Sequence, residues 1–231
     1  MQDREKHPRI DLWFGRLTGN EQRCADLQRL LDTEQRGRAE QFKTSALRNR
    51  YFESWGVVRE ILADYLSAAP ETLRFARQQY GKPYLPDCPE LCFNLSHSGG
   101  HMLVAVAWRC QLGVDIEQIK SRGHFPGLVN KCFAGAEIAW WQALPDSEKV
   151  PAFFRLWTRK EAFVKATGRG IALGMQHVET VPETPGGFVQ IPEHYGKPEH
   201  WRLVDLDFRE DLSGALVVKG EQPTCSWHAF A

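Results

Sequence analysis

The feature that most constrains the fold of this chain of 231 residues is an order of predicted elements that occurs twice. In each half, hydrophobic periodicity predicts a strand, two short helices, a long helix and then further strands. The long helices also share a Phe-x-x-Trp spacing, in F-E-S-W at 52–55 and F-R-L-W at 154–157. We therefore expect an α+β protein of two similar halves, residues 1–110 and 111–231, packed as a pseudo-dimer with a ligand site in the cleft between them.

The boundaries of the predicted elements follow from turn signals and periodicity. In the first half they are a strand at 10–17, helices at 21–31, 35–42 and 46–66, and strands at 73–78, 91–95 and 102–108. In the second half they are a strand at 112–117, helices at 126–133, 136–144 and 152–166, and strands at 178–181, 188–191, 201–207 and 213–218. The long helix of the first half is expected to face the core with Tyr51, Trp55, Val58, Leu62 and Tyr65.

Composition argues against several classes of protein. The 29 Lys and Arg residues balance 29 Asp and Glu residues, whereas general binding to a nucleic-acid backbone needs a basic excess. No run approaches the roughly 18 apolar residues of a membrane span, and the N-terminal MQDREKHPRID lacks the apolar core of a signal peptide. Six dispersed cysteines without a C-x-x-C pair fit reduced thiols. We expect a cytoplasmic protein without nucleic-acid or membrane partners.

One alternative metal pattern is C-x3-C-x4-H-x3-H, formed by Cys88, Cys92, His97 and His101. In a zinc finger about a dozen residues separate the two ligand pairs, so that strand and helix can fold back onto the metal. Here only four residues separate the pairs, and a strand is predicted there. The spacing therefore disfavours structural zinc.

Two acidic residues share one face of the strand predicted at 112–117. In G-V-D-I-E, Asp115 and Glu117 alternate with apolar residues, so both carboxylates point the same way. A solvated strand face explains this pattern as well as a bound cation does. Glu161, on a later helix, would complete a set of three carboxylates, and such oxygen ligands suit Mg²⁺, which commonly also contacts substrate phosphates.

Other residues are suited to an anion, although each has a simpler explanation. Lys165 lies one helical turn beyond Glu161, and an i,i+4 ion pair worth roughly 0.2–0.5 kcal/mol would account for that spacing. S-H-S-G-G at 96–100 follows a predicted strand, and Y-G-K-P at 80–83 is a turn that presents a lysine. A basic cluster has a solvated helix face as its ordinary explanation, and it consists of Arg36, Arg38, Lys43, Arg48 and Arg50.

Together these motifs resemble the paired signature of the 4′-phosphopantetheinyl transferases, roughly (I/V)-G-(I/V)-D-(I/L/V)-E followed by W-x-x-K-E-(A/S)-x-x-K. G-V-D-I-E at 113–117 and W-T-R-K-E-A-F-V-K at 157–165 match this signature. Y-G-K-P and F-N-L-S-H-S-G, at 80–83 and 93–99, resemble motifs of the larger pseudodimeric type, exemplified by the surfactin-synthetase activator. The duplicated layout extends the resemblance over most of the chain.

The resemblance implies roles for individual residues. Asp115, Glu117 and Glu161 match magnesium ligands, and Glu161 and Lys165 match the residues closest to the chemistry. Residues implied to hold the phosphates of coenzyme A are Lys165, Lys82, Ser96, His97, Arg50 and, by a looser match, Arg38.

Three further motif positions need separate interpretation. Trp157 and Lys160 belong to the motif, yet helix geometry turns Lys160 by about 100° from Glu161, so we interpret Lys160 as a supporting residue. Gln35 stands where this type often has a lysine. That departure concerns recognition of the adenine side of coenzyme A rather than the chemistry.

The implied reaction is magnesium-dependent transfer of the phosphopantetheine arm of coenzyme A to a serine of an apo acyl or peptidyl carrier protein, with release of 3′,5′-adenosine bisphosphate. Glu161, directly or through a metal-bound water, would take the serine proton, and Lys165 would stabilise charge on the pyrophosphate. Whether Glu161 can be both ligand and base stays open. Two alternatives also stay open: a magnesium-dependent phosphohydrolase that uses the same acids, and a non-catalytic module that binds carrier proteins.

The resemblance also implies a monomer and a surface for its partner. The segment G-H-F-P-G-L-V-N-K-C-F at 123–133 carries more apolar residues than a short connection needs. Ordinary packing of a short helix on the core would explain it. The surfactin-type relatives dock carriers in this region, so we expect Phe125 or Leu128 to be exposed to the carrier, with Lys120, Arg122 and Lys131 steering its acidic face.

Overall fold

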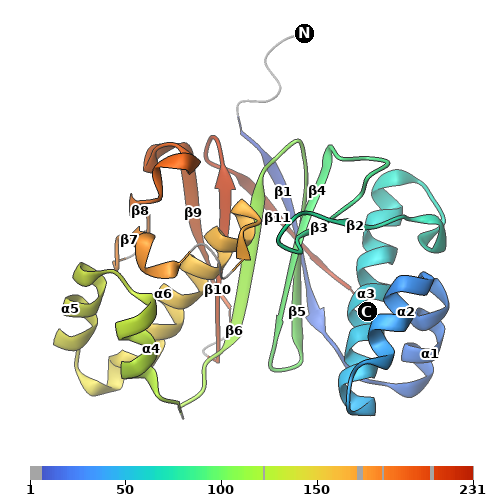
Figure 1. Cartoon of the computed structure of the whole chain (residues 1–231), viewed down its shortest axis with the longest axis horizontal. Coiled ribbons are helices and arrows are strands. Elements are labelled where there is room, and N and C mark those ends of the chain that lie inside the picture. The colour runs from blue at the N-terminus through green and yellow to red at the C-terminus, as the bar shows by residue number, and fades with distance from the viewer. Residues whose placement is uncertain (1–6, 122, 171–173, 184, 209–210, 231) are drawn as a thin grey trace, which may run out of the picture.

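The computed structural model describes residues 7–121, 123–170, 174–183, 185–208 and 211–230. Two sheets lie in the middle of the molecule, and helices cover the outer side of each sheet (Figure 1). The α+β class predicted from the sequence is confirmed. Of the helices in the described part of the chain, none combines the length and apolar character needed to span a bilayer.

The first half begins with a strand and three helices. These are β1 (Arg9–Arg16), α1 (Glu21–Leu30), α2 (Thr33–Glu40) and α3 (Ser45–Leu66). A polar side chain stands before each helix and accepts a bond from a free backbone N–H of its first turn, which fixes where the helix starts. After a 3-10 turn at Pro70–Thr72 come the short strands β2 (Ala76–Arg77) and β3 (Pro83–Tyr84), and then β4 (Leu91–Ser98) and β5 (His101–Trp108).

The second half repeats a strand followed by three helices. These are β6 (Leu112–Gln118), α4 (Phe125–Cys132), α5 (Gly135–Ala143) and α6 (Asp146–Thr167). The remaining strands are β7 (Glu179–Thr180), β8 (Phe188–Gln190), β9 (Trp201–Leu206), β10 (Leu212–Lys219) and β11 (Thr224–Ala229). Short 3-10 turns lie at Met175–His177, Glu193–Tyr195 and Pro198–His200.

The two halves share one strand order. The first sheet is ordered β11-β1-β5-β4 and the second β6-β10-β9. In each half the strand before the helices pairs antiparallel with the second strand of a later hairpin, as β1 pairs with β5 and β6 pairs with β10. The long helices α3 and α6 each have 22 residues. The repeated order read from the sequence is therefore present in the chain's topology.

Three predicted elements differ from the observed ones by three residues or more at one end. β4 continues to Ser98, because pairing with β5 persists until the turn at Gly99 and Gly100, which have φ of 59° and 83°. α6 begins at Asp146 rather than at residue 152, since Pro151 removes only one bond near the start of the helix and acidic side chains favour that first turn. The strand predicted at 73–78 shrinks to the two residues of β2.

The last strand, β11, was not predicted and joins the first sheet. It runs parallel to β1, with Ile10 opposite Cys225 and Leu12 opposite Trp227. A strand that follows the second half in sequence therefore completes the sheet of the first. The division of the chain at residue 110 stays a prediction.

Apolar side chains from both sheets meet in one shared core. Ile10 and Leu12 of β1 lie there with Val114 and Ile116 of β6 and Leu216 of β10, all fully buried. The opposite face of each sheet packs on its own long helix. Of the residues expected to face the core from α3, Trp55, Val58 and Leu62 are buried, and Tyr51 and Tyr65 are partly buried.

Candidate active site

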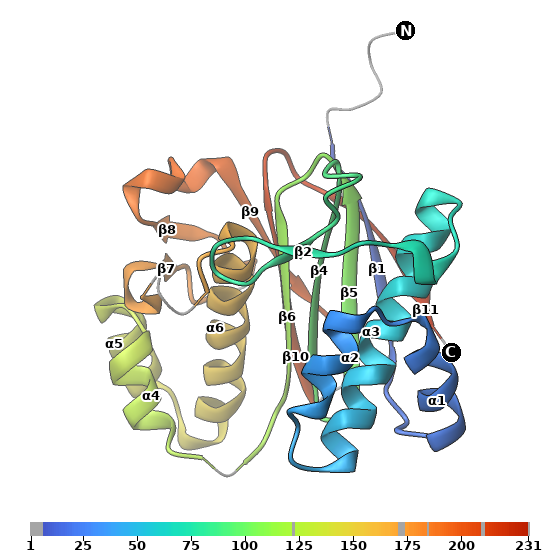
Figure 2. The same ribbon diagram turned by 45° about the vertical axis from the view of Figure 1, so that its right-hand side comes forward.

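The predicted site residues gather where the two sheets meet. β4 is the edge strand of the first sheet and β6 the edge strand of the second. β6 lies next to β4 and beside α6 (Figure 2). A cavity of about 350 Å³ opens at this seam. Its lining comprises Leu95, Ser96 and His97 from β4, Asp115 and Glu117 from β6, and Trp157, Glu161 and Lys165 from α6.

Side chains of β4 join the two edge strands. Asn94 Oδ1 accepts a bond from the Val114 N–H at 2.8 Å. Ser96 Oγ donates to Asp115 Oδ1 at 2.7 Å, and Ser98 Oγ donates to Glu117 Oε2 at 2.6 Å. Because residue numbers rise together along both strands, β4 and β6 run in the same direction. The first half of the chain thus holds the acidic strand of the second through polar side chains.

Lys165 does not form the local ion pair that its spacing from Glu161 suggested. Among the described residues its Nζ donates to Asp115 Oδ1 at 2.6 Å and to Ser96 Oγ at 2.8 Å. The Lys165 side chain is 27% exposed and lines the cavity. The lysine therefore links α6, β6 and β4 and still faces the cavity.

The two glutamates bind protons more strongly than ordinary carboxyls. Burial raises the pKa of Glu117; the hydrogen bond from Ser98 opposes this rise and the negative charge of Asp115 adds to it. Burial also raises the pKa of Glu161, with Asp115 adding to the rise and Lys165 opposing it. Three half-buried or buried carboxylates in one cavity repel one another, so the site favours an added positive charge.

The donor set fits a hard divalent cation, although the acids do not close into a preformed cage. In the described part of the chain, no three His, Cys, Asp or Glu side chains are arranged as a metal site. Asp115 Oδ2, however, is buried and without a hydrogen-bond partner among the described residues. Buried polar atoms normally have partners, so this oxygen, with the carboxylates of Glu117 and Glu161, is suited to Mg²⁺.

Lys160 and Trp157 hold α6 in place. Lys160 is fully buried, pairs with the Glu137 carboxylate at 2.6 Å, and donates to the carbonyl oxygens of Met175 and Val178. This confirms its interpretation as a supporting residue. Trp157 stacks on Phe153 with ring centroids 5.7 Å apart and also forms part of the cavity wall.

Lys82 lines a neighbouring cavity together with Leu95 and Lys165, and its ammonium group points to the backbone. Its Nζ donates to Leu112 O at 2.7 Å and to Ala166 O at 3.2 Å, so it ties the start of β6 to the end of α6. Burial lowers the pKa of Lys82 to about 8. Its predicted contact with a phosphate of coenzyme A would require the side chain to change direction.

The other predicted phosphate ligands lie at different distances from the cavity. Partial burial lowers the pKa of His97, and the charges of Lys165 and Arg50 lower it further, which places exposed Arg50 near this edge of the site. Exposed Arg38 lies on α2 near Tyr51, where it opposes the rise that burial causes in the tyrosine's pKa. The charge of Arg50 thus acts on a residue of the cavity, whereas that of Arg38 acts on Tyr51.

Gln35, the position that departs from the motif, is a buried residue that forms hydrogen bonds in the core. It is buried, its Oε1 accepts a bond from Arg59 Nε at 2.8 Å, and its backbone N–H is bound by Asp32. Arg59 is itself buried and paired with Asp32. Gln35 thus belongs to the core beneath α2.

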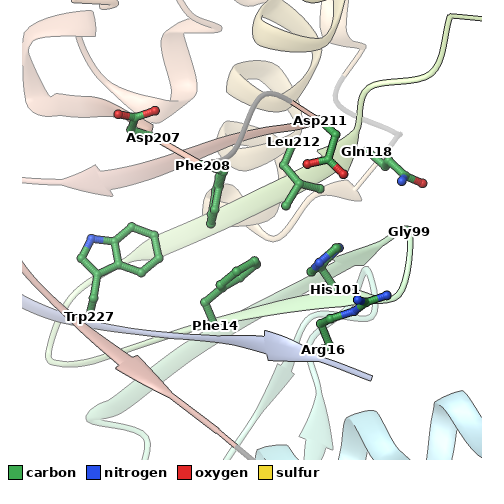
Figure 3. Close-up of a pocket in the computed structure, with 10 residues that line it drawn as sticks. All are labelled: Phe14, Arg16, Gly99, His101, Gln118, Asp207, Phe208, Asp211, Leu212 and Trp227. Atoms are coloured by element: carbon green, nitrogen blue, oxygen red, sulfur yellow. The ribbon is translucent and has the colours of Figure 1, made fainter. Parts of the chain in front are cut away.

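A larger cavity of about 820 Å³ opens elsewhere between the two sheets (Figure 3). Its walls combine aromatic rings with charged and polar side chains; Phe14 is stacked on His101, and Phe208 is packed edge-on against Trp227. It contains none of the acids of the motif. The smaller cavity is therefore the candidate active site, because the three motif carboxylates line it together with Lys165.

Sequence reasoning missed the roles of Asn94 and Ser98. Both lie on the face of β4 that carries Ser96, so their alternation in N-x-S-x-S was the available signal. That signal depended on recognising that β4 extends to residue 98.

Three carboxylates and a lysine in one cavity define a site suited to an anionic substrate with a divalent cation, as in phosphoryl-transfer enzymes. The family model described as the 4′-phosphopantetheinyl transferase superfamily matches residues 111–224, and the model for the N-terminal part of 4′-phosphopantetheinyl transferases matches residues 18–109.

Curated relatives carry the same name. The 4′-phosphopantetheinyl transferase HetI of a Nostoc species is 33% identical, over 91% of this chain and 88% of the relative. Sfp of Bacillus subtilis is 32% identical over 51% of each chain, and AcpT of Escherichia coli is 38% identical over 50% of this chain and 58% of its own. The chain therefore belongs to the family of 4′-phosphopantetheinyl transferases and is a transferase.

Proposed function

We propose that this protein transfers the 4′-phosphopantetheine arm of coenzyme A to a serine hydroxyl of an apo acyl or peptidyl carrier protein. The observation that carries the proposal is the convergence of Asp115, Glu117, Glu161 and Lys165 in one cavity of a family member. In this reaction the serine oxygen attacks the β-phosphorus of coenzyme A. The bond from that phosphorus to the bridging oxygen breaks, and 3′,5′-adenosine bisphosphate leaves.

Different residues of the chain would stabilise charge and transfer the proton. Lys165, whose Nζ is held by Ser96 and Asp115 and whose side chain lines the cavity, would donate to the pyrophosphate and stabilise its charge. The carboxylate of Glu161 would take the proton of the carrier serine, and its raised pKa makes it a stronger base than an ordinary glutamate. His97 on β4 and Arg50 on α3 would hold the 3′-phosphate.

We also propose that the acids hold Mg²⁺. Asp115, Glu117 and Glu161 would be its ligands, with the unpartnered Asp115 Oδ2 as one contact atom. The ion would neutralise charge on the pyrophosphate when bound. Without it, the mutual repulsion of three carboxylates opposes an anionic substrate in the same cavity.

An exposed leucine supports our proposal for the surface that meets the carrier protein. Leu128 on α4 is 39% exposed, whereas Phe125 packs against Phe153 with ring centroids 4.9 Å apart. The prediction that one of the two would be exposed is confirmed for Leu128, and Arg122 lies outside the described residues. We propose that Leu128 meets an apolar helix of the carrier.

The proposal extends to assembly and location. The shared strand order supports a pseudo-dimer of two halves, and because one chain supplies both sides of the cavity, a monomer is sufficient. All six cysteines are free, which supports action in the reducing cytoplasm.

Intact mass spectrometry tests the function directly. Apo carrier proteins from fatty-acid, polyketide and nonribosomal-peptide synthesis are incubated with coenzyme A and Mg²⁺. A mass increase equal to the phosphopantetheine arm, lost with EDTA, is expected for at least one carrier. Release of nucleotide without labelling of any carrier would favour a phosphohydrolase, and binding without either product would favour a non-catalytic module.

A further inference from the structure

We propose that Ser96 and Ser98 of β4 are positioning residues, each of which holds one oxygen of an acid on β6 and leaves the other oxygen of that acid for the cation. The inference rests on the proposed function, because it presupposes that Asp115 and Glu117 bind a divalent cation. Two serines of the first half of the chain would thus orient two carboxylates of the second half.

The hydroxyl of Ser96 has a fixed direction. Its Oγ accepts a bond from Lys165 Nζ at 2.8 Å, and an ammonium group can only donate. The single hydroxyl hydrogen therefore goes to Asp115 Oδ1, 2.7 Å away. Lys165 Nζ contacts the same Oδ1 at 2.6 Å, so both partners occupy one oxygen. Asp115 Oδ2 remains buried and unpartnered among the described residues, and it is the oxygen left for the cation.

Ser98, two residues after Ser96 on β4, holds Glu117 in the same way as Ser96 holds Asp115. Its Oγ accepts a bond from the backbone N–H of Gln118 at 3.1 Å. Its hydrogen therefore goes to Glu117 Oε2, 2.6 Å away. In the described part of the chain no hydrogen bond is made to Glu117 Oε1. Each serine thus engages one carboxylate oxygen and leaves its neighbour available.

The repeat follows from strand geometry. Side chains two residues apart share one face of a strand, so S-x-S on β4 lies opposite D-x-E on the parallel β6. Asn94, two residues before Ser96, fixes this register by accepting the Val114 N–H at 2.8 Å. A slip of one residue would turn both serines away from the acids.

Binding of Mn²⁺, a paramagnetic substitute for Mg²⁺, tests the inference without relying on turnover. Electron paramagnetic resonance of free Mn²⁺ gives its affinity for the full chain in the presence of coenzyme A. Removing a residue that hydrogen-bonds to a metal ligand typically lowers metal affinity about 10- to 100-fold. We expect Ser98→Ala and Ser98→Val to raise the Mn²⁺ dissociation constant by about tenfold or more, and Ser98→Thr, which keeps the hydroxyl, to stay within about twofold.

Ser213→Ala is the matched control. Ser213 lies directly opposite Glu117 on the other neighbouring strand, β10, is half-buried like Ser98, and places its hydroxyl 3.3 Å from Thr158 Oγ1. This variant should bind Mn²⁺ as the wild type does.

Two outcomes would overturn the inference in distinguishable ways. Wild-type Mn²⁺ affinity in Ser98→Val would refute the positioning role and leave the proposed function standing. A wild-type protein that binds no Mn²⁺ even with coenzyme A would refute the metal centre and, with it, the positioning role. The Thr and Val variants have the same shape, so a difference between them reports the hydroxyl and not a failure to fold.

Discussion

At the residue scale, Glu117 carries a charge that the folded chain disfavours. Burial raises its pKa, the Ser98 hydroxyl opposes the rise, and Asp115 adds to it. In the unfolded chain the same carboxyl titrates near its ordinary value of 4.5. Between these two pKa values the folded chain binds more protons than the unfolded chain, so this group's contribution to stability is lost as pH rises.

Replacement of Glu117 by Gln removes that titration. In EDTA, we expect the free energy of unfolding of Glu117→Gln, relative to the wild type, to increase as pH rises from about 4.5 and then to level off above the raised pKa. Urea denaturation at a series of pH values measures this difference. Added Mg²⁺ should stabilise the wild type more than the variant. A difference that does not change with pH would contradict the raised pKa.

The acids themselves could be predicted from sequence, whereas their partners could not. Asp115 and Glu117 follow from strand alternation, which is local. Lys165 was assigned two readings, an ion pair with Glu161 and an anion ligand, because helical spacing places the two side chains on one face. The structure pairs Lys165 with Asp115 and Ser96 rather than with Glu161, and those contacts depend on how β4, β6 and α6 come together. The role of Lys165 as an anion ligand stays a prediction.

At the element scale, α4 presents an apolar side chain outward. Val129 is buried on its inner face, while Leu128 is 39% exposed. Burial of a leucine side chain contributes roughly 1.5–3 kcal/mol, and about 1.4 kcal/mol corresponds to a tenfold change in affinity.

Leu128→Glu should therefore raise the apparent KM for the carrier by about tenfold or more, because a charge replaces the apolar contact. The affinity for coenzyme A should not change, since Leu128 is not among the residues that line the cavity. Steady-state kinetics with a varied carrier and calorimetric titration of coenzyme A measure the two quantities.

Val189→Glu provides the control for an added surface charge. Val189 lies on β8 and is 53% exposed. It should leave the KM for the carrier as it is. Equal carrier kinetics for Leu128→Glu and the wild type, or loss of coenzyme A binding in that variant, would contradict docking on α4.

The helices were easier to predict than the strands for a physical reason. Apolar periodicity and capping residues lie within the helix itself, so α3 was placed to within one residue of its start at Ser45. β11 alternates Cys225 and Trp227 with polar residues, but its partner β1 lies more than 200 positions earlier in the chain. Nothing local to the strand reveals that pairing.

At the scale of the whole molecule, the two halves are joined by contacts that neither can make alone. The sheet seam is held by Asn94, Ser96 and Ser98, and β11 from the end of the chain pairs with β1 near its start. The shared core buries Val114, Ile116 and Leu216 of the second half against Ile10 and Leu12 of the first. The repeated strand order could be predicted from sequence, but this mutual dependence could not.

That dependence predicts the behaviour of separated halves. Fragments 1–110 and 111–231, produced separately, would each expose one side of the shared core, and fragment 1–110 would lack β11. Three large apolar side chains contribute roughly 5–9 kcal/mol when buried, which is comparable to the ~5–15 kcal/mol of a whole domain. We expect neither fragment alone to show a cooperative thermal transition. When the two fragments are co-expressed, we expect them to form a complex that transfers phosphopantetheine, because Ser96 and Ser98 then contact Asp115 and Glu117 again. Circular dichroism and intact mass of a carrier provide the measurements. A fragment 111–231 that folds cooperatively and binds coenzyme A by itself would show that the second half is independent of the first.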